Sequence, residues 1–214
     1  MANQFHITVM AGGPGAEREI SLRSGTAVQK ALRASGHCVT EIDPLEKGWK
    51  LPSNTEVVFL ALHGEYGEDG QVQSWLETLG VPYTGTGPEG SRVAFDKELT
   101  KQVFEQNVIP TPRWIMLANT RALPPTDLGE GWVLKPPRQG SSVGLQIVDA
   151  PDQWHEALAI AGDYGGPVLC EELIRGREIT VGILDKVALP IVEVRPKDGP
   201  YDYHNKYTVG ATDY

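Results

Sequence analysis

The sequence has few cysteines, no excess of positive charge and no long apolar run. The only cysteines, Cys38 and Cys170, lie in apolar, strand-like segments without metal-ligand spacing, so we expect buried thiols in a reducing compartment. A formal net charge of -9 argues against a nucleic-acid-binding protein, which needs a basic surface. No segment resembles a signal peptide or reaches membrane-spanning length. We therefore expect a cytoplasmic protein without a nucleic-acid or membrane partner.

The first half alternates apolar strand-like segments with helical patterns. Strands are predicted at 6–13, 38–44, 57–64 and 81–87, and helices at 16–36 and 71–80. Such alternation predicts a mostly parallel sheet covered on both faces.

The second half has a different pattern, and we place a domain boundary near residues 88–93. A helix is predicted at 96–107, followed by a proline-containing link. The predicted strands are 113–117, 131–136, 142–148, 167–173, 177–184 and 188–196, with a helix at 151–162. The fold class is therefore α/β in the first half and α+β, with antiparallel strands, in the second.

The segment "KPPRQGSSVG" (135–144) combines a lysine with a turn rich in glycine and serine. Backbone amides and the hydroxyls of Ser141 and Ser142 can donate to phosphate oxygens, and Lys135 adds positive charge. Because the lysine precedes the glycines, the segment is not a Walker A loop. A surface hairpin with an ordinary lysine is the alternative.

Three carboxylates flank the strand-like segments after residue 167. Glu171 and Glu172 end one strand, and Glu178 begins the next. They can read the amino group and ribose hydroxyls of an adenine nucleotide. A charged hairpin exposed to solvent is the alternative.

The first predicted strand is followed by glycines and a helix, as in dinucleotide-binding folds. Gly13 and Gly15 have the spacing of that fingerprint, but Arg18 replaces its third glycine, and Asp43 is a weak candidate for the ribose-binding acid. Glu17, at the start of the helix, can bind the ammonium group of a small amino acid. Its alternative role is a favourable charge near a helix N-terminus.

His63 follows a predicted strand, at the end of the sheet where open α/β folds bind ligands. An isolated histidine is more often packed or solvated. The neighbouring glycines and acids in "HGEYGEDGQVQ" nevertheless suggest an ordered loop at this position.

Seven segments occur in an order that is specific to one family. They are "GG..AEREISLRSG", "LHGEYGEDGQVQ", "PYTGTG", "DK", "KPPRQGSSVG", "EELIRGRE" and "YDYHNKYTVGATDY". Together they resemble the bacterial D-alanine:D-alanine ligases, which are members of the ATP-grasp superfamily. The resemblance implies ATP-dependent ligation of two D-alanines through an acyl phosphate, for peptidoglycan precursors.

The resemblance also implies roles for individual residues around the amino-acid substrate. Glu17 would hold the ammonium of the first D-alanine in a hydrogen-bonded chain with Ser141 and Tyr207. His63 would lie near that substrate.

A second set of residues would bind ATP. Lys97, Lys135, Lys206 and Ser142 would contact the phosphates. Glu171, Glu172 and Ile174 would line the adenine pocket, and Glu178 would reach the ribose. The final fourteen residues would form a mobile loop over the reaction centre.

Applied to the whole chain, the resemblance predicts three parts. The parts are an N-terminal α/β substrate lobe (1–90), the small ATP-grasp subdomain (91–170) and the start of an incomplete C-terminal ATP-grasp subdomain (171–214). The family's magnesium ligands lie beyond this point, so we expect Mg²⁺ to be required and the 214 residues alone to be inactive. The resemblance also suggests a homodimer.

Two alternative functions remain open at this stage. One is a ligase that joins D-alanine to D-lactate, although Tyr207 in "KYTVGAT" resembles the dipeptide-forming type. The other is a non-catalytic module that binds a nucleotide or an amino acid.

Overall fold

The computed structural model describes residues 4–214, which form two compact units. The first unit extends to Val108 and includes Arg138–Gly140, and the second comprises Ile109–Pro137 and Ser141–Tyr214. The predicted division at residues 90 and 170 stays a prediction.

The first unit is built on a parallel sheet, as its alternating pattern predicts. Its strands are β1 (His6–Met10), β2 (Cys38–Ile42) and β3 (Val57–Leu60), in the order β2-β1-β3, and both pairings are parallel. The central strand β1 is buried from its second residue onward. Burial of this central strand explains why its sequence is mostly apolar, and the one buried polar side chain, Thr8, hydrogen-bonds the Thr55 hydroxyl.

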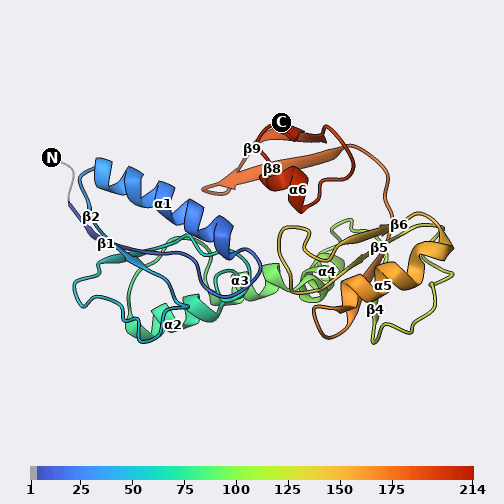
Figure 1. The fold of residues 1–214 in the computed structure, drawn as a ribbon, viewed down its shortest axis with the longest axis horizontal. Helices are drawn as coiled ribbons and strands as arrows, with labels where there is room; N and C mark the ends of the chain where they lie inside the picture. The colour runs from blue at the N-terminus through green and yellow to red at the C-terminus, as the bar shows by residue number, and fades with distance from the viewer. Residues whose placement is uncertain (1–3) are drawn as a thin grey trace. The chain divides into compact units, whose positions relative to one another are not determined.

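Helices cover both faces of this sheet (Figure 1). The helices of this unit are α1 (Arg18–Ala34), α2 (Gln71–Leu79), α3 (Pro88–Phe95) and α4 (Lys97–Gln106). α1 lies on one face and α2 on the other. Gly25 lets α1 approach the end of β1, because a Cβ at this position would collide with the side chain of Ala11.

Three features of the first unit differ from the sequence-based prediction. Residues Pro88–Phe95 form α3, which begins with proline at its first turn, a favoured position that the prediction overlooked. The predicted strand at 81–87 is reduced to one bridge between Val58 and Tyr83. Cys38 is exposed and not buried, because it begins the edge strand β2.

The second unit contains the predicted antiparallel sheet. Its strands are β4 (Trp114–Leu117), β5 (Trp132–Lys135), β6 (Gln146–Val148) and β7 (Val168–Glu172), in the order β4-β7-β5-β6. A 3₁₀ turn, η1 (Pro151–Gln153), leads into α5 (Trp154–Gly162), which packs on this sheet.

The core between α5 and the sheet is closely packed and apolar. Leu134, Leu158 and Trp154 are fully buried, and the rings of Trp132 and Trp154 meet edge to face with centroids 5.3 Å apart. Cys170 is buried, as expected, and removal from water raises the pKa of its thiol to about 12. This thiol is therefore protonated at neutral pH.

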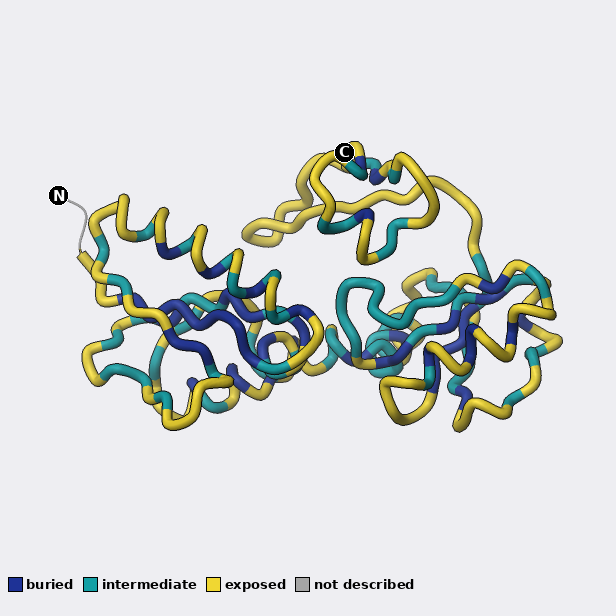
Figure 2. The backbone as a smooth tube through the Cα atoms, viewed as in Figure 1, coloured by how far each residue is buried: buried dark blue, intermediate teal, exposed yellow. Residues whose placement is uncertain are grey.

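The rest of the second unit is a hairpin with a short helix and strand. Its elements are β8 (Glu178–Leu184), β9 (Val187–Pro196), α6 (Tyr203–Tyr207) and β10 (Thr212–Asp213), with the order β10-β9-β8. Figure 2 shows that β8 and most of β9 are exposed. Large apolar side chains are among the exposed ones, for example Ile183 and Ile191, each 67% exposed. Strands of this composition are typical of sheets that are covered on both faces.

Within residues 4–214, none of the helices is both long and apolar enough to cross a lipid bilayer.

Replacing Leu134 with alanine should destabilise the second unit by about 2–5 kcal/mol, because the cavity left in a close-packed core cannot fully collapse. Chemical denaturation followed by tryptophan fluorescence measures this effect, since Trp132 and Trp154 lie in the same core. The matched control Leu123→Ala removes the same atoms from a side chain that is 75% exposed and should change the free energy by less than about 0.5 kcal/mol. Equal losses in both variants would contradict the assigned core.

Candidate functional site

The carboxyl ends of β1, β2 and β3 meet at one edge of the parallel sheet. The strands end at Met10, Ile42 and Leu60, and the register pairs Met10 with both of the other ends. Loops that follow the three strands therefore leave from the same edge, where open α/β sheets bind ligands. These loops lead to Glu17, Asp43 and His63.

Glu17 is buried in the first unit, with 5% of its surface exposed. It is the N-cap residue of α1. Its carboxylate packs against the backbone of Gly64 and Gly140, since a Cβ on Gly64 would lie 2.7 Å from Oε2 and one on Gly140 would also collide. Only residues without a side chain allow such a close approach, so these glycines shape the space around the Glu17 carboxylate.

His63 lies on the loop after β3 and contacts two polar side chains. Its Nε2 lies 3.1 Å from the Ser24 hydroxyl, and its Nδ1 lies 4.0 Å from Glu68 Oε1. Removal from water and the charge of Glu17 raise the pKa of Glu68, although a hydrogen bond from the Gly64 amide and the charge of His63 lower it in part. Glu17, His63 and Glu68 thus form one electrostatically coupled group.

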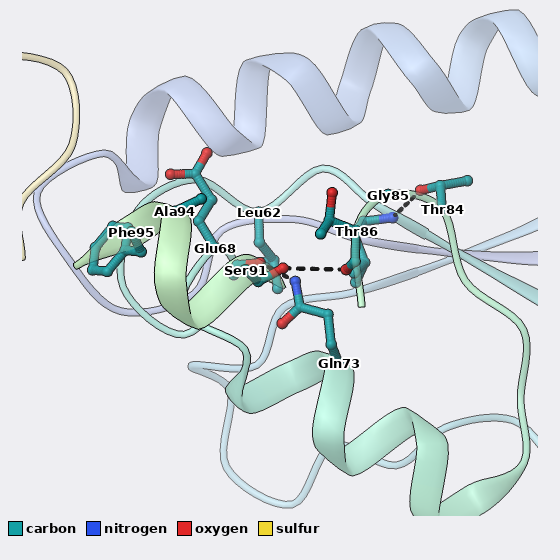
Figure 3. Close-up of a pocket in the computed structure, with 11 residues that line it drawn as sticks. Leu62, Glu68, Gln73, Thr84, Gly85, Thr86, Ser91, Ala94 and Phe95 are labelled. Atoms are coloured by element: carbon teal, nitrogen blue, oxygen red, sulfur yellow. Dashed lines mark hydrogen bonds between the residues drawn. The ribbon is translucent and has the colours of Figure 1, made fainter. Parts of the chain in front are cut away.

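A cavity of about 380 Å³ lies beside this group, between the loop after β3 and α3 (Figure 3). Glu68, Thr84, Thr86 and Ser91 give it polar walls, and Phe95 contributes to its apolar lining. The Ser91 hydroxyl donates to the Thr86 carbonyl at 3.1 Å. The segments "GEDG" (67–70) and "PYTGTG" (82–87), which lie within the family motifs noted in the sequence, both contribute to the lining of this cavity.

Asp43 follows β2, is buried, and forms an ion pair with the partly exposed Arg18. Arg18 Nη2 donates to Asp43 Oδ2 at 2.5 Å and Nη1 donates to Oδ1 at 3.0 Å. The Gly13 and Leu45 amides also donate to Oδ1, each at 2.9 Å. Burial acts to raise the pKa of Asp43, but these donors outweigh it and hold the pKa below its usual value. The carboxylate is thus already committed to protein donors, which argues against a ribose-binding role.

Lys97 begins α4, whose N-terminus is capped by Asp96. The Asp96 carboxylate accepts from the Glu98 amide at 3.0 Å and from Arg138 Nε at 2.7 Å. Lys97 Nζ donates to the Gln139 carbonyl at 2.6 Å. These contacts explain why residues 138–140 of the glycine and serine turn belong to the first unit.

The remaining part of that turn belongs to the second unit and has an unusual backbone. Ser141 and Ser142 have φ angles of 50° and 62°, a left-handed region that non-glycine residues adopt at a cost. The Ser141 hydroxyl lies 2.5 Å from the Tyr207 hydroxyl, and the Ser142 hydroxyl donates to the Tyr201 carbonyl at 3.2 Å. The first of these hydrogen bonds joins Ser141 and Tyr207, two residues that the resemblance places in one hydrogen-bonded chain at the first D-alanine.

Charged side chains line up on β5 and β7 in the second unit. Lys135 forms an ion pair with Glu171, which is buried. Val133 is the register partner of Glu171, so Lys135 and Glu171 project from the same face of the sheet. Glu172 instead accepts from the Arg113 backbone amide at 2.9 Å and from its Nε at 2.7 Å.

The other predicted site residues of the second unit are more exposed. Ile174 is 63% exposed, and Glu178 is an exposed residue at the start of β8. Lys206 Nζ lies 5.2 Å from the centre of the Tyr201 ring, and the Tyr203 and Tyr207 rings are 4.8 Å apart. A hydrogen bond to Tyr214 and loss of water raise the pKa of Tyr201 to about 12.

Sequence reasoning missed Ser21, Ser24 and Glu68 near the edge of the parallel sheet. Ser21 accepts from the Gly12 amide at 2.8 Å and donates to the Ala61 carbonyl at 2.7 Å. Glu17, Ser21 and Ser24 have i, i+4, i+7 spacing, which places them on one face of α1. That spacing was the available signal for Ser21 and Ser24.

No group of three or more histidine, cysteine, aspartate or glutamate side chains in residues 4–214 is arranged to hold a metal ion. Mg²⁺ is commonly held by one or two carboxylates together with substrate phosphates, so this finding leaves its binding residues unassigned.

Family models match most of the chain. The model described as D-ala D-ala ligase C-terminus matches residues 104–214, and that described as D-ala D-ala ligase N-terminus matches residues 37–86.

Named relatives support the same family over nearly the whole chain. A D-alanine–D-alanine ligase of Methylacidiphilum infernorum is 44% identical over 209 residues, which cover 98% of this chain and 68% of the relative. One of Aquifex aeolicus is 44% identical over 216 residues, which cover 98% of this chain and 73% of the relative.

Solved structures agree with the sequence relatives. A D-alanine–D-alanine ligase from Bacillus anthracis superposes with a TM-score of 0.81 at 33% identity, covering 98% of this chain and 70% of that one. A structure of the Bacillus anthracis enzyme complexed with ATP gives a TM-score of 0.79 at 30% identity, covering 98% and 69%. The fold thus defines a ligase of ATP-grasp architecture.

The matching sequence models and relatives narrow this class further. The chain belongs to the D-alanine–D-alanine ligase family.

Gly64→Ala should destabilise the first unit more than Gly36→Ala, because only the former adds a collision with Glu17. Both glycines have positive φ angles, 68° and 89°, but nothing lies within 4 Å of a Cβ built on Gly36. Left-handed backbone alone costs about 1–2 kcal/mol, and displacing the end of the Glu17 side chain from its rotamer should add about 0.5–1.5 kcal/mol at Gly64. Denaturant unfolding of both variants measures the difference. Equal losses would show that the contact between Glu17 and Gly64 does not constrain this side chain.

Proposed function

We propose that this protein joins two D-alanines in an ATP-dependent, ADP-forming reaction that passes through an acyl phosphate. A carboxylate is a poor electrophile, so transfer of the ATP γ-phosphoryl group to the first D-alanine creates a leaving group. The amine of the second D-alanine then attacks the activated carbonyl, forms the peptide bond and releases phosphate. Family membership and the buried carboxylate of Glu17 support this assignment.

Glu17 is the proposed binding group for the ammonium of the first D-alanine. Glu17 is buried at the sheet edge where open α/β folds bind ligands, and a carboxylate can accept a charge-assisted hydrogen bond from an ammonium group. His63 takes a position beside this substrate, held by Ser24 and Glu68. The burial of Glu17 at the sheet edge, with His63 on the neighbouring loop, is the single observation that carries the proposal.

The phosphates of ATP are assigned to lysines and to the serine turn. Lys97, Lys135 and Lys206 supply positive charge, which stabilises a transferring phosphoryl group. Ser142 and the turn amides donate hydrogen bonds, and the left-handed backbone at Ser141 and Ser142 supports a specialised role for this turn. Ser141 and Tyr207 act together on the first D-alanine, a role supported by their hydrogen bond.

The adenosine part of ATP is assigned to the end of β7 and the start of β8. Glu171, Glu172 and Ile174 form the adenine-binding wall, and Glu178 reaches the ribose. Glu171 and Glu172 form ion pairs with Lys135 and Arg113, respectively.

Several further properties belong to the same proposal. The segment at 201–214 acts as a lid that excludes water from the reaction centre. The enzyme works with Mg²⁺, in the cytoplasm, where ATP is plentiful, and as a homodimer.

The test of the ligase assignment is ADP formation from ATP that depends on D-alanine and Mg²⁺. The assay uses a protein in which this chain is extended with the part of the Methylacidiphilum infernorum relative that lies outside the matched 68%. Chromatography should identify the product as the D-alanine dipeptide. An extended protein that folds, binds ATP and still ignores D-alanine would contradict the assignment.

Glu17→Gln should weaken D-alanine binding about tenfold or more, because a charge-assisted hydrogen bond to the ammonium is lost. ATP affinity should stay unchanged. Calorimetric titration of each ligand measures both values. Glu19→Gln is the matched control, since it removes an exposed carboxylate two residues further along α1 and should leave both affinities unchanged. Equal weakening of D-alanine and ATP by Glu17→Gln would rule out the assigned role.

Lys135→Ala should raise the dissociation constant for ATP about tenfold or more, by removing a charged donor to the phosphates. The change also unpairs buried Glu171, so thermal unfolding must first show that the variant is folded. Arg175→Ala is the control, because it removes an exposed cation that pairs with Asp149 in the same unit. Unchanged ATP affinity in folded Lys135→Ala would remove Lys135 from the phosphate site.

A further inference from the structure

Asp43 and Arg18 have no part in the proposed reaction, yet they make a dense set of contacts beside Glu17. We infer that Asp43, acting through Arg18 and Gly13, is a positioning residue that fixes the loop of residues 12–17 and so orients the Glu17 carboxylate. This inference rests on the proposed role of Glu17 in binding D-alanine.

The contacts of Asp43 converge on the loop between β1 and α1. The carboxylate accepts from the Gly13 amide at 2.9 Å and pairs with both terminal nitrogens of Arg18. Arg18 Nη1 also donates back to the Gly13 carbonyl at 3.2 Å. Both polar groups of the Gly13 backbone are therefore held by the Asp43–Arg18 pair.

This loop fits the Asp43 carboxylate closely. A Cβ on Gly12 would lie 2.6 Å from both the Asp43 carboxyl carbon and its Oδ2. The Gly12 amide donates to the Ser21 hydroxyl of α1 at 2.8 Å, so Gly12 is fixed as well as Gly13. The loop is thus held by Asp43 on one side and by α1 on the other.

Arg18 connects this loop to Glu17 directly along the chain. Arg18 is the first residue of α1 and follows Glu17, the N-cap. A guanidinium held by two carboxylate oxygens in a planar fork has little rotational freedom. Fixing Arg18 and Gly13 therefore restricts the backbone on both sides of Glu17.

The geometry distinguishes positioning from ligand binding by Asp43 itself. Asp43 is 8% exposed, and its two oxygens accept four hydrogen bonds from protein donors. Three of these hydrogen bonds go to Oδ1 and one goes to Oδ2. Burial and this set of protein donors favour a role in holding the loop over direct contact with a ligand.

The test compares Asp43→Asn with wild type in two measurements. Hydrogen–deuterium exchange should become about tenfold faster for amides in residues 12–19, because the amide group of asparagine places donors opposite donors. Calorimetric titration should show D-alanine binding weakened about tenfold, with ATP affinity unchanged. Arg18→Lys is a second variant that keeps the positive charge but loses the planar fork, and it should act in the same direction.

Asp96→Asn is the matched control, because Asp96 is also buried, accepts from two backbone amides and pairs with an arginine. In Asp96→Asn, hydrogen–deuterium exchange should become faster at the start of α4 and not in residues 12–19. The affinity for D-alanine should be unchanged. The inference is overturned if neither Asp43→Asn nor Arg18→Lys speeds exchange in residues 12–19. It is also overturned if D-alanine affinity is unchanged, or if D-alanine and ATP affinities fall equally. Failure of wild type to bind D-alanine would instead overturn the proposed function.

Discussion

The parallel register of β1, β2 and β3 is the constraint on which the site of the first unit depends. Because all three strands run in one direction, their following loops leave from one edge and bring Glu17, Asp43 and His63 from distant parts of the sequence to it. β1 is the central strand and is buried from its second residue onward, so it pairs on both sides within a sheet that is covered on both faces. The same edge then supplies a buried carboxylate and the polar groups that hold it.

The site in the first unit combines a charge that is costly to bury with a rigid frame. Glu17 packs against the backbone of Gly64, where any side chain would collide, and its loop is held by Asp43 and Arg18. In the proposed function this carboxylate binds the substrate ammonium, and a rigid frame limits the entropy lost when the substrate binds. The second unit has its own strained element at Ser141 and Ser142, joined to the segment at 201–207.

Much of the fold could be predicted from sequence, because its strongest signals are local. The apolar segment at β1 and the helical spacing of α1 gave the parallel sheet, and the strand pattern after residue 112 gave the antiparallel sheet. α3 was missed because its glycine and proline content resembles a turn, although proline suits a helix start. Cys38 was placed inside because an edge strand and a central strand have similar composition.

The candidate site could be predicted only in part. Glu17 and His63 stand next to glycines after strands, which is a readable signal, but their roles came from the resemblance and not from spacing. The contacts of Asp43 could not be derived, because Arg18 and Gly13 meet it only through the three-dimensional path of the loop. Hydrogen bonds between residues far apart in sequence, such as Ser141 with Tyr207, leave no local pattern either.

The account depends most on a buried carboxylate at the edge of the parallel sheet that receives an amino-acid ammonium. A crystal structure of the protein with D-alanine and a non-hydrolysable ATP analogue tests this directly. The account predicts the D-alanine nitrogen within hydrogen-bonding distance of the Glu17 carboxylate, with the Asp43–Arg18 pair intact. D-alanine bound elsewhere, with Glu17 still paired only to protein groups, would contradict it.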